Sequence, residues 1–306
     1  MSMRKILSIS VLAIAAAAFA SATILFDDFN YPVGPLDGQN GGTGWAGAWV
    51  GIPEYVVASG SLFYNGLQQS GNRAQFIPSD EAGTNSIRTL SSLGSDGSTF
   101  WLSFLISVDG TLAQNTADFR IDSKDQHLYV GRELDDQANW SVEDGGSTTP
   151  YTQSSIPIVP GQALFVAIRF DQNIDPNAND TVTIYLNPTP ALVPSATPGV
   201  PGMVLTDLNF NTTNVTIGLD GSAFPDPTTT GFRANYDPIR GGTTYFDVAP
   251  GISSAVPEPA TWSLMAGGLA IFAIAQRRRA RNVTLPGWVG MSRFCSDEQR
   301  TGTKPL

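Results

Sequence analysis

Several short segments of this chain carry an apolar residue at every second position, and this pattern constrains the fold more than any other feature. The clearest segment is residues 99–108, and residues 164–170, 182–186 and 215–219 repeat it. A period of two is that of a β-strand with one buried face. Clusters of Gly, Asp and Ser separate the segments as turns. The pattern predicts an all-β fold in which two antiparallel sheets pack face to face, as a β-sandwich or jelly roll.

The region between the two terminal segments has about 230 residues, enough for one sandwich domain with a well-buried core. We place this domain at residues 23–250. It contains no cysteine, because the single Cys295 lies in the C-terminal tail. No disulfide can therefore support the fold, and its stability must come from buried apolar and aromatic side chains.

The N-terminal segment has the features of a secretory signal peptide. Arg4 and Lys5 precede an apolar run over residues 6–20, and Ala20 and Ala22 have the spacing of a cleavage site. We predict a signal helix over residues 1–22, removed on export, so that the mature chain begins at Thr23.

The C-terminal segment combines a rigid linker, an apolar span and a basic stop. We predict a linker over residues 251–260, a transmembrane helix with its basic stop over residues 261–281 and a disordered tail over residues 282–306. Arginines after the span favour an orientation in which the sandwich lies outside the cytoplasm. The residues that carry this pattern are Val256, Pro257, Glu258, Pro259, Arg277, Arg278, Arg279 and Arg281.

This order of Pro-Glu-Pro, apolar span and arginine cluster resembles the PEP-CTERM sorting signal of bacterial surface proteins. The resemblance implies recognition and cleavage by a membrane enzyme of the exosortase type. It further implies that the protein is held in the membrane by its C-terminal helix and then passes to the cell surface or an extracellular matrix.

The exported part of the chain is strongly acidic. Between Thr23 and Pro250 lie 24 acidic against eight basic residues, a formal net charge of −16. Such a charge repels nucleic acid phosphates, so DNA or RNA binding is excluded as a function class. The charge is typical of a soluble secreted protein, with cation binding as the alternative.

A second resemblance covers most of residues 24–250. Residues 26–31, Gly44-Trp45 and Trp49 resemble the first strand and loop of concanavalin-like, laminin-G-like sandwich domains, and residues 236–248 resemble their last strand. The resemblance implies a concanavalin-like sandwich, but a fold does not imply a function.

Catalytic patterns are absent from the sequence. Some enzymes of the wider sandwich superfamily carry three acids as Glu-x-Asp-x-x-Glu on one strand, whereas this chain has Glu133 and Asp135 followed by Ala138. His127 is the only histidine, and we interpret it as a partly exposed strand residue. We therefore predict that the protein is not an enzyme.

The densest group of oxygen ligands lies in residues 171–180. Its ligand candidates are Asp171, Asn173, Asp175 and Asp180, but Pro176 and Val182 stand where a calcium loop of the EF type needs Gly and Glu. Two interpretations remain open. One is a looser calcium site, and the favoured one is a hairpin loop of Asx and Pro turns. No other cofactor is expected.

Four aromatic residues lie in polar, loop-like settings: Trp45, Trp49, Trp140 and Tyr151. They are candidates for stacking on sugar rings, although packing against the sandwich is the favoured interpretation of each. We predict a structural or adhesive role with weak binding of extracellular polysaccharide. The alternative is a carbohydrate-active enzyme, a glycoside hydrolase or lyase, whose acid pair the sequence does not reveal.

Overall fold

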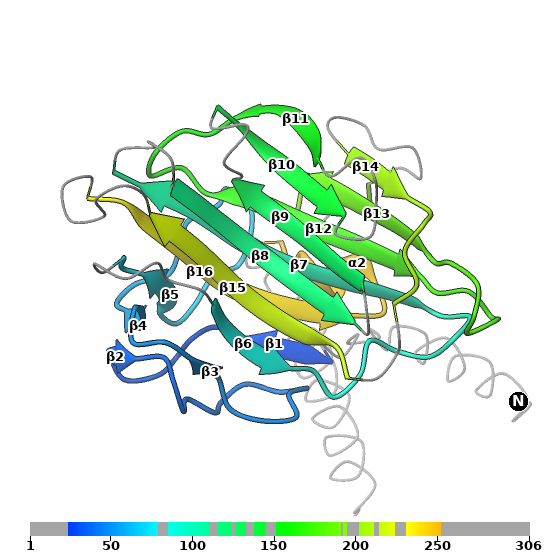
Figure 1. The fold of residues 1–306 in the computed structure, drawn as a ribbon, viewed down its shortest axis with the longest axis horizontal. Coiled ribbons are helices and arrows are strands. Elements are labelled where there is room, and N and C mark those ends of the chain that lie inside the picture. Colours follow the sequence, from blue (N-terminus) through cyan, green and yellow to red (C-terminus); the bar gives the residue numbers. More distant parts are fainter. Residues whose placement is uncertain are drawn as a thin grey trace, which may run out of the picture. The chain divides into compact units, whose positions relative to one another are not determined.

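The alternating segments form two antiparallel β-sheets packed face to face, which confirms the predicted antiparallel β-sandwich (Figure 1). The computed structural model describes residues 24–78, 85–110, 115–123, 126–132, 138–144, 151–190, 192–194, 202–210, 214–223 and 231–251. The predicted signal helix, its cleavage residues Ala20 and Ala22, and the predicted transmembrane helix lie outside these residues, as do all the residues of the sorting pattern.

The larger sheet has nine strands, ordered β14-β13-β12-β7-β16-β5-β4-β2, with β1 paired to β16. Its strands are β1 (Leu25–Asp27), β2 (Gly34–Pro35), β4 (Tyr55–Ala58), β5 (Arg73–Phe76), β7 (Thr99–Asp109), β12 (Leu164–Asp171), β13 (Thr181–Leu186), β14 (Gly202–Leu205) and β16 (Arg233–Gly242). The four segments predicted from periodicity correspond to β7, β12, β13 and, in the smaller sheet, β15.

The smaller sheet has seven strands, ordered β11-β10-β9-β8-β15-β6-β3. Its strands are β3 (Val50–Gly51), β6 (Asn85–Thr89), β8 (Asn115–Ser123), β9 (Gln126–Arg132), β10 (Asn139–Asp144), β11 (Tyr151–Pro157) and β15 (Thr216–Ala223). Neighbouring strands in the sequence are mostly neighbours in this sheet, as β8 to β11 show.

The main core lies between the two sheets and is rich in aromatic side chains. Phe104 of β7 stacks on Phe119 of β8 with 3.7 Å between ring centroids, so the two sheets are in direct contact. Tyr236 of β16 donates a hydrogen bond from its hydroxyl to the carbonyl of Asp220 in β15. Buried rings and a buried phenol thus connect the layers in a domain without cysteine.

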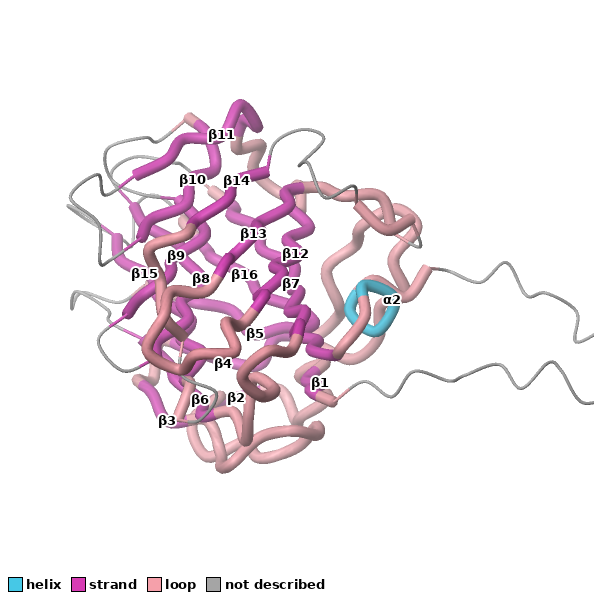
Figure 2. The backbone as a smooth tube through the Cα atoms, turned by 90° about the vertical axis from the view of Figure 1, so that its right-hand side faces the viewer, coloured by secondary structure: helices cyan, strands magenta, loops and turns pink. Residues whose placement is uncertain are grey.

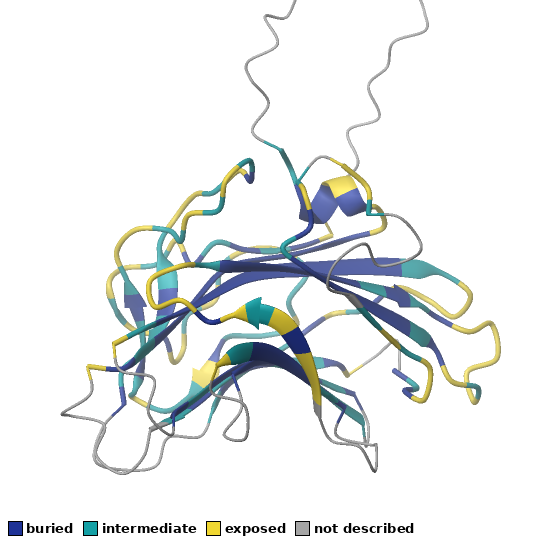
Figure 3. Cartoon of the chain, turned by 90° about the horizontal axis from the view of Figure 1, so that it is seen from above, coloured by how far each residue is buried: buried dark blue, intermediate teal, exposed yellow. Residues whose placement is uncertain are grey.

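A second cluster covers the outer face of the larger sheet. The periodicity predicts one buried face for β7, yet both faces are buried, because Trp101 and Leu105 point outward beneath a further layer. That layer includes the short helix α2 (Tyr245–Val248), which lies on the side of the larger sheet away from the smaller sheet (Figures 2 and 3). The Tyr245 ring packs edge-on against Trp101 at 5.3 Å.

A buried ion pair joins the two sheets at one end. Asp27 of β1 and Arg88 of β6 are each 1% exposed, and Arg88 Nη1 lies 2.6 Å from Asp27 Oδ2. The same carboxylate accepts hydrogen bonds from Trp49 Nε1 at 3.0 Å and from the Tyr31 hydroxyl at 2.8 Å. Arg88 also donates to the carbonyls of Gly41 and Gly47. Every strong donor around the carboxylate is therefore used within the fold.

The glycine-rich stretch at residues 38–47 closes around this pair. Its backbone approaches β1 so closely that a Cβ on Gly42 would lie 2.0 Å from the carbonyl oxygen of Phe26, and one on Gly44 would lie 2.3 Å from that of Ile24. Both glycines have φ near +75° to +80°, which side chains disfavour. The stretch is thus a packed part of the N-terminal segment.

Replacing Arg88 by Ala should lower the free energy of unfolding by about 3–5 kcal/mol, because Asp27 would stay buried without its cation. Chemical denaturation monitored by tryptophan fluorescence measures this loss. Arg169→Ala is the matched control, since its pair with Asp171 is about one-third exposed on each side and should contribute about 1 kcal/mol or less. Equal losses in the two variants would contradict the proposed importance of the buried pair.

A second buried acid, Asp237, lies on the outer face of β16 at an irregularity in the register with β7. Its carboxyl accepts hydrogen bonds from the Ser61 hydroxyl and, at 3.0 Å, from the Leu62 backbone N–H. Burial raises the pKa of Asp237 to about 8, against the lowering effect of these donors and of Arg240. The folded protein therefore holds a proton at Asp237 at neutral pH.

Asp237 should make the protein less stable as the pH rises. Between pH 3.8 and about 8 the folded state binds this proton and the unfolded state does not, so the free energy of unfolding falls with pH across that window. Asp237→Asn should flatten the fall, whereas Asp175→Asn, at an exposed acid, should leave it unchanged. Melting temperatures measured from pH 4 to 9 would contradict this account if all three proteins lost stability in parallel.

Candidate functional site

The predicted sugar-stacking aromatics are mostly occupied within the fold. Trp49 is fully buried and Trp140 is 2% exposed, so neither ring has an open face. Trp45 is half-buried, donates from Nε1 to the Phe26 carbonyl, and has the Arg88 guanidinium 4.6 Å from its ring centroid. Tyr151 begins β11, and its side chain lies outside the described residues. Trp49 and Trp140 thus both belong to the buried core between the sheets.

The oxygen-rich loop at residues 171–180 uses its side chains to hold its own backbone. Asp180 accepts from the N–H groups of Asn173 and Phe210, both at 2.8 Å. Asn173 and Asp175 each accept from the backbone N–H two residues ahead, as Asx turns do. Asp171 instead turns to Arg169 and Thr99.

These four candidates for calcium ligands are thus committed to protein donors. Among the described residues, no group of three or more His, Cys, Asp or Glu could hold a metal ion. The arrangement is that of the favoured hairpin loop. Glu133 and Asp135, the two acids of the incomplete hydrolase pattern, lie outside the described residues.

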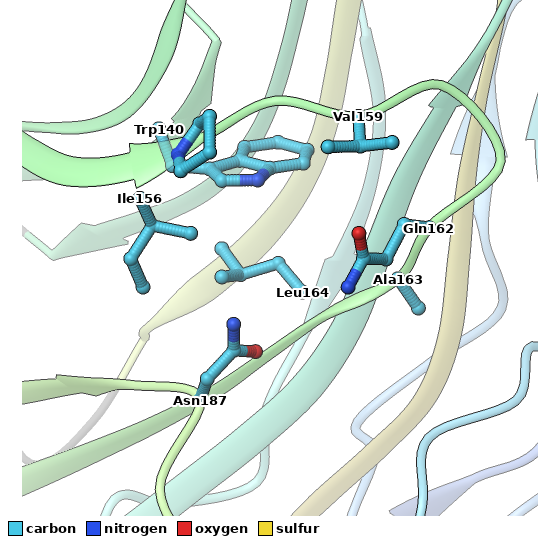
Figure 4. A pocket seen from close by; sticks show the side chains of 8 residues that line it. Trp140, Ile156, Val159, Gln162, Ala163, Leu164 and Asn187 are labelled. Carbon is cyan, nitrogen blue, oxygen red and sulfur yellow. The ribbon is translucent and has the colours of Figure 1, made fainter.

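A pocket of about 100 Å³ lies where β10 and β11 of the smaller sheet face β12 and β13 of the larger sheet (Figure 4). Trp140 forms one wall with the edge of its indole, and Ile156 and Leu164 supply apolar surface. The amide side chains of Gln162 and Asn187 border the opposite side. Trp140 therefore contributes to a site through its edge, although its face is buried.

Three side-chain N–H donors at this pocket have no partner among the described residues: Trp140 Nε1, Asn187 Nδ2 and Gln162 Nε2. Asn187 is held firmly, because its Oδ1 accepts from the Phe165 backbone N–H at 3.0 Å and its own N–H donates to the Phe165 carbonyl at 2.7 Å. Its backbone has φ of 53°, a left-handed conformation that Asn tolerates. The free Nδ2 is consequently aimed at the pocket by the backbone.

A wider hollow of about 480 Å³ adjoins the pocket and shares Gln162, Ala163 and Asn187 with it. It adds Phe63 and Tyr64 from the connection between β4 and β5, together with Asn65, Thr189 and Pro190. We call the two hollows together the Asn187 groove. Phe63 is 72% exposed and presents an open ring, whereas the Tyr64 ring packs 5.2 Å from Phe165.

A separate polar cluster occupies the outer face of β8 and β9 and contains the only histidine. His127 Nδ1 lies 2.5 Å from Asp122 Oδ1, and Arg120 Nε lies 2.6 Å from the same oxygen. Arg120 also lies over the Tyr129 ring, with 5.3 Å to its centroid. Burial raises the pKa of Tyr129 to about 12, so its hydroxyl keeps its proton at neutral pH.

Sequence reasoning placed His127 on a strand as a partly exposed residue, and its side chain is 35% exposed there. It missed the partners of His127 and the amides of the Asn187 groove. Arg120 and Asp122 are two residues apart on one strand, as are His127 and Tyr129 on the next. Residues two apart lie on the same face of a strand, so this spacing of polar residues indicates the cluster. Gln162 and Asn187 carry no such local signal.

Comparison with known proteins identifies the C-terminal segment. Residues 255–279 match the family described as the PEP-CTERM protein-sorting motif. The chain therefore carries this motif, which implies export, exosortase processing and sorting to the cell surface. No curated protein sequence matches the chain. Among the described residues no helix is long and apolar enough to cross a membrane.

Solved structures similar to this chain include an endo-β-1,4-glucuronan lyase from Trichoderma reesei, with 11% identity and a TM-score of 0.46 over 75% of this chain and 99% of the other. An alginate lyase from Aplysia kurodai has 8% identity and a TM-score of 0.43 over 73% and 100%. Domain 4 of an extracellular arabinanase from Geobacillus stearothermophilus, in complex with arabinotriose, has 16% identity and a TM-score of 0.45 over 75% and 98%. At this level the likenesses assign no function.

Proposed function

We propose that this exported protein is a non-enzymatic surface or matrix protein that binds polysaccharide in the Asn187 groove. The observation that carries the proposal is the combination of an exposed ring, Phe63, with the side-chain N–H donors of Gln162 and Asn187 in one hollow. Proteins recognise sugars by stacking the apolar face of the ring on an aromatic side chain and by hydrogen bonding to its polar groups.

The chemistry of the groove supports binding without catalysis. Its described lining contains no Asp, Glu, His, Lys or Arg. Burial raises the pKa of the Tyr64 phenol, so this group stays neutral as well. Glycosidic bond cleavage needs a base or nucleophile as well as a proton donor at the reacting atoms, and the described lining of the groove has no carboxylate or imidazole to act as that base or nucleophile.

The sorting motif supports the proposed location. Before processing, the apolar span after residue 260 would hold the protein in the membrane as a transmembrane helix, with the arginines on the cytoplasmic side. After processing, the sandwich would reach the cell surface or an extracellular polysaccharide matrix. A protein that binds polysaccharide would there act as a structural or adhesive component.

Depletion of the full-length protein, purified in detergent, by a panel of insoluble polysaccharides tests the proposal. Phe63→Ala should weaken binding roughly tenfold through loss of the stacking surface. Ile174→Ala is the matched control, because Ile174 is 84% exposed in the loop at the opposite end of β12 and β13. Binding that resists Phe63→Ala, or no binding to any polysaccharide, would refute the proposed site.

The polar cluster on β8 and β9 suggests a second candidate function, that of a carbohydrate-active enzyme. His127 beside Asp122 is a candidate general base, and Arg120 and Tyr129 are donors next to it. We expect no release of reducing ends or unsaturated products from the same panel. Release that His127→Ala abolishes and Phe63→Ala retains would establish the enzyme instead.

A further inference from the structure

One donor in the Asn187 groove is exceptional because it is attached to a buried side chain. Trp140 is 2% exposed, yet its indole N–H has no acceptor among the described residues and faces the pocket (Figure 4). The N–H atom is not itself buried, because it opens on the pocket beside Leu164. A donor held in a fixed position by a buried ring can bind an acceptor that enters the pocket from outside the chain.

The other side chains that line the pocket indicate which kind of ligand group carries the acceptor. Asn187 presents Nδ2 because its oxygen is already used by Phe165, so it too is a donor. Ile156 and Leu164 supply apolar surface beside these two donors. The pocket thus complements a small group that has an acceptor oxygen at one end and a methyl group at the other.

The size and charge of the pocket exclude larger and charged groups. The pocket has a volume of about 100 Å³, which suits a small substituent and not a whole sugar ring. A carboxylate would be buried here without a cation, because no described lining residue is basic, and the exported region is itself strongly acidic. A hydroxyl would use the donors but would leave the apolar wall uncovered.

We propose that the smaller pocket of the Asn187 groove, the one lined by Trp140, is a subsite for the acetamido group of an N-acetylated amino sugar. This inference rests on the proposed function and names its ligand class. The carbonyl oxygen of the acetamido group accepts from Trp140 Nε1 and Asn187 Nδ2, and its methyl group packs against Ile156 and Leu164. The wider hollow with Phe63 then receives the neighbouring sugar residue. The ligand is therefore a neutral glycan rich in N-acetyl groups.

Titration calorimetry with three oligosaccharides of equal length and β-1,4 linkage tests this inference on the full-length protein in detergent. The oligomers are made of N-acetylglucosamine, glucosamine and glucose. We expect the N-acetylated oligomer to bind at least about tenfold more tightly than the glucose oligomer, since it adds a hydrogen-bonded carbonyl and a buried methyl group. Physiological ionic strength limits the general attraction of the cationic oligomer to the acidic protein.

Trp140→Phe removes the indole N–H and keeps an aromatic ring, so it should abolish the preference for the N-acetylated oligomer. Trp45→Phe is the matched control, because its N–H is used by Phe26 away from the groove, and it should keep the preference. If Trp140→Phe does not fold, Asn187→Asp takes its place: it keeps an oxygen that accepts from the Phe165 backbone N–H but removes the Nδ2 donor, and it should reduce the preference severalfold.

The outcomes separate this inference from the function on which it rests. Equal binding of the glucose and N-acetylated oligomers, weakened by Phe63→Ala, would overturn the acetamido subsite and keep the polysaccharide-binding function. A preference that survives Trp140→Phe or its substitute would also overturn the subsite. No binding of any oligomer or polysaccharide would overturn both.

Discussion

The ion pair between Asp27 and Arg88 connects the two sheets at the end where the N-terminal segment packs. Asp27 belongs to the first strand of the larger sheet, and Arg88 belongs to the smaller sheet. Each charge is buried and is compensated by the other and by hydrogen bonds from Trp49, Tyr31 and the glycine-rich stretch. Through these hydrogen bonds the pair holds Tyr31, Trp49 and the backbone of the glycine-rich stretch against the sandwich.

Two further groups of charged residues do not line the proposed site. Asp237 and Arg240 are under the connection between β4 and β5, on the outer face of the larger sheet. Arg120, Asp122 and His127 are on the outer face of the smaller sheet. The described lining of the Asn187 groove is neutral. The lining consists of side-chain amides, the edge of an indole and aromatic rings. Such groups bind a neutral ligand by hydrogen bonding and stacking.

The connection between β4 and β5 serves both the fold and the proposed function. Through Ser61 and Leu62 it covers Asp237, and through Phe63 and Tyr64 it forms a wall of the groove. The packing of Tyr64 on Phe165 positions the exposed ring of Phe63 beside Asn187. A rigid scaffold therefore presents the stacking surface, which limits the entropy lost when a glycan binds.

The alternating segments by themselves indicated β-strands, because side chains of a strand point to opposite faces with a period of two. The turn clusters between them favoured antiparallel pairing, since parallel neighbours need long crossover connections. The terminal pattern likewise determined the sorting motif, which is read from linear sequence. The burial of Trp140 and the second buried face of β7 depended on the tertiary structure, since residue types beside Trp140 or Trp101 do not reveal which strand or helix will cover them. The Asn187 groove was decided only by tertiary structure as well. Trp140, Gln162 and Asn187 lie far apart in the chain, and they meet because β10 and β11 pack across from β12 and β13, a long-range contact that local periodicity does not encode.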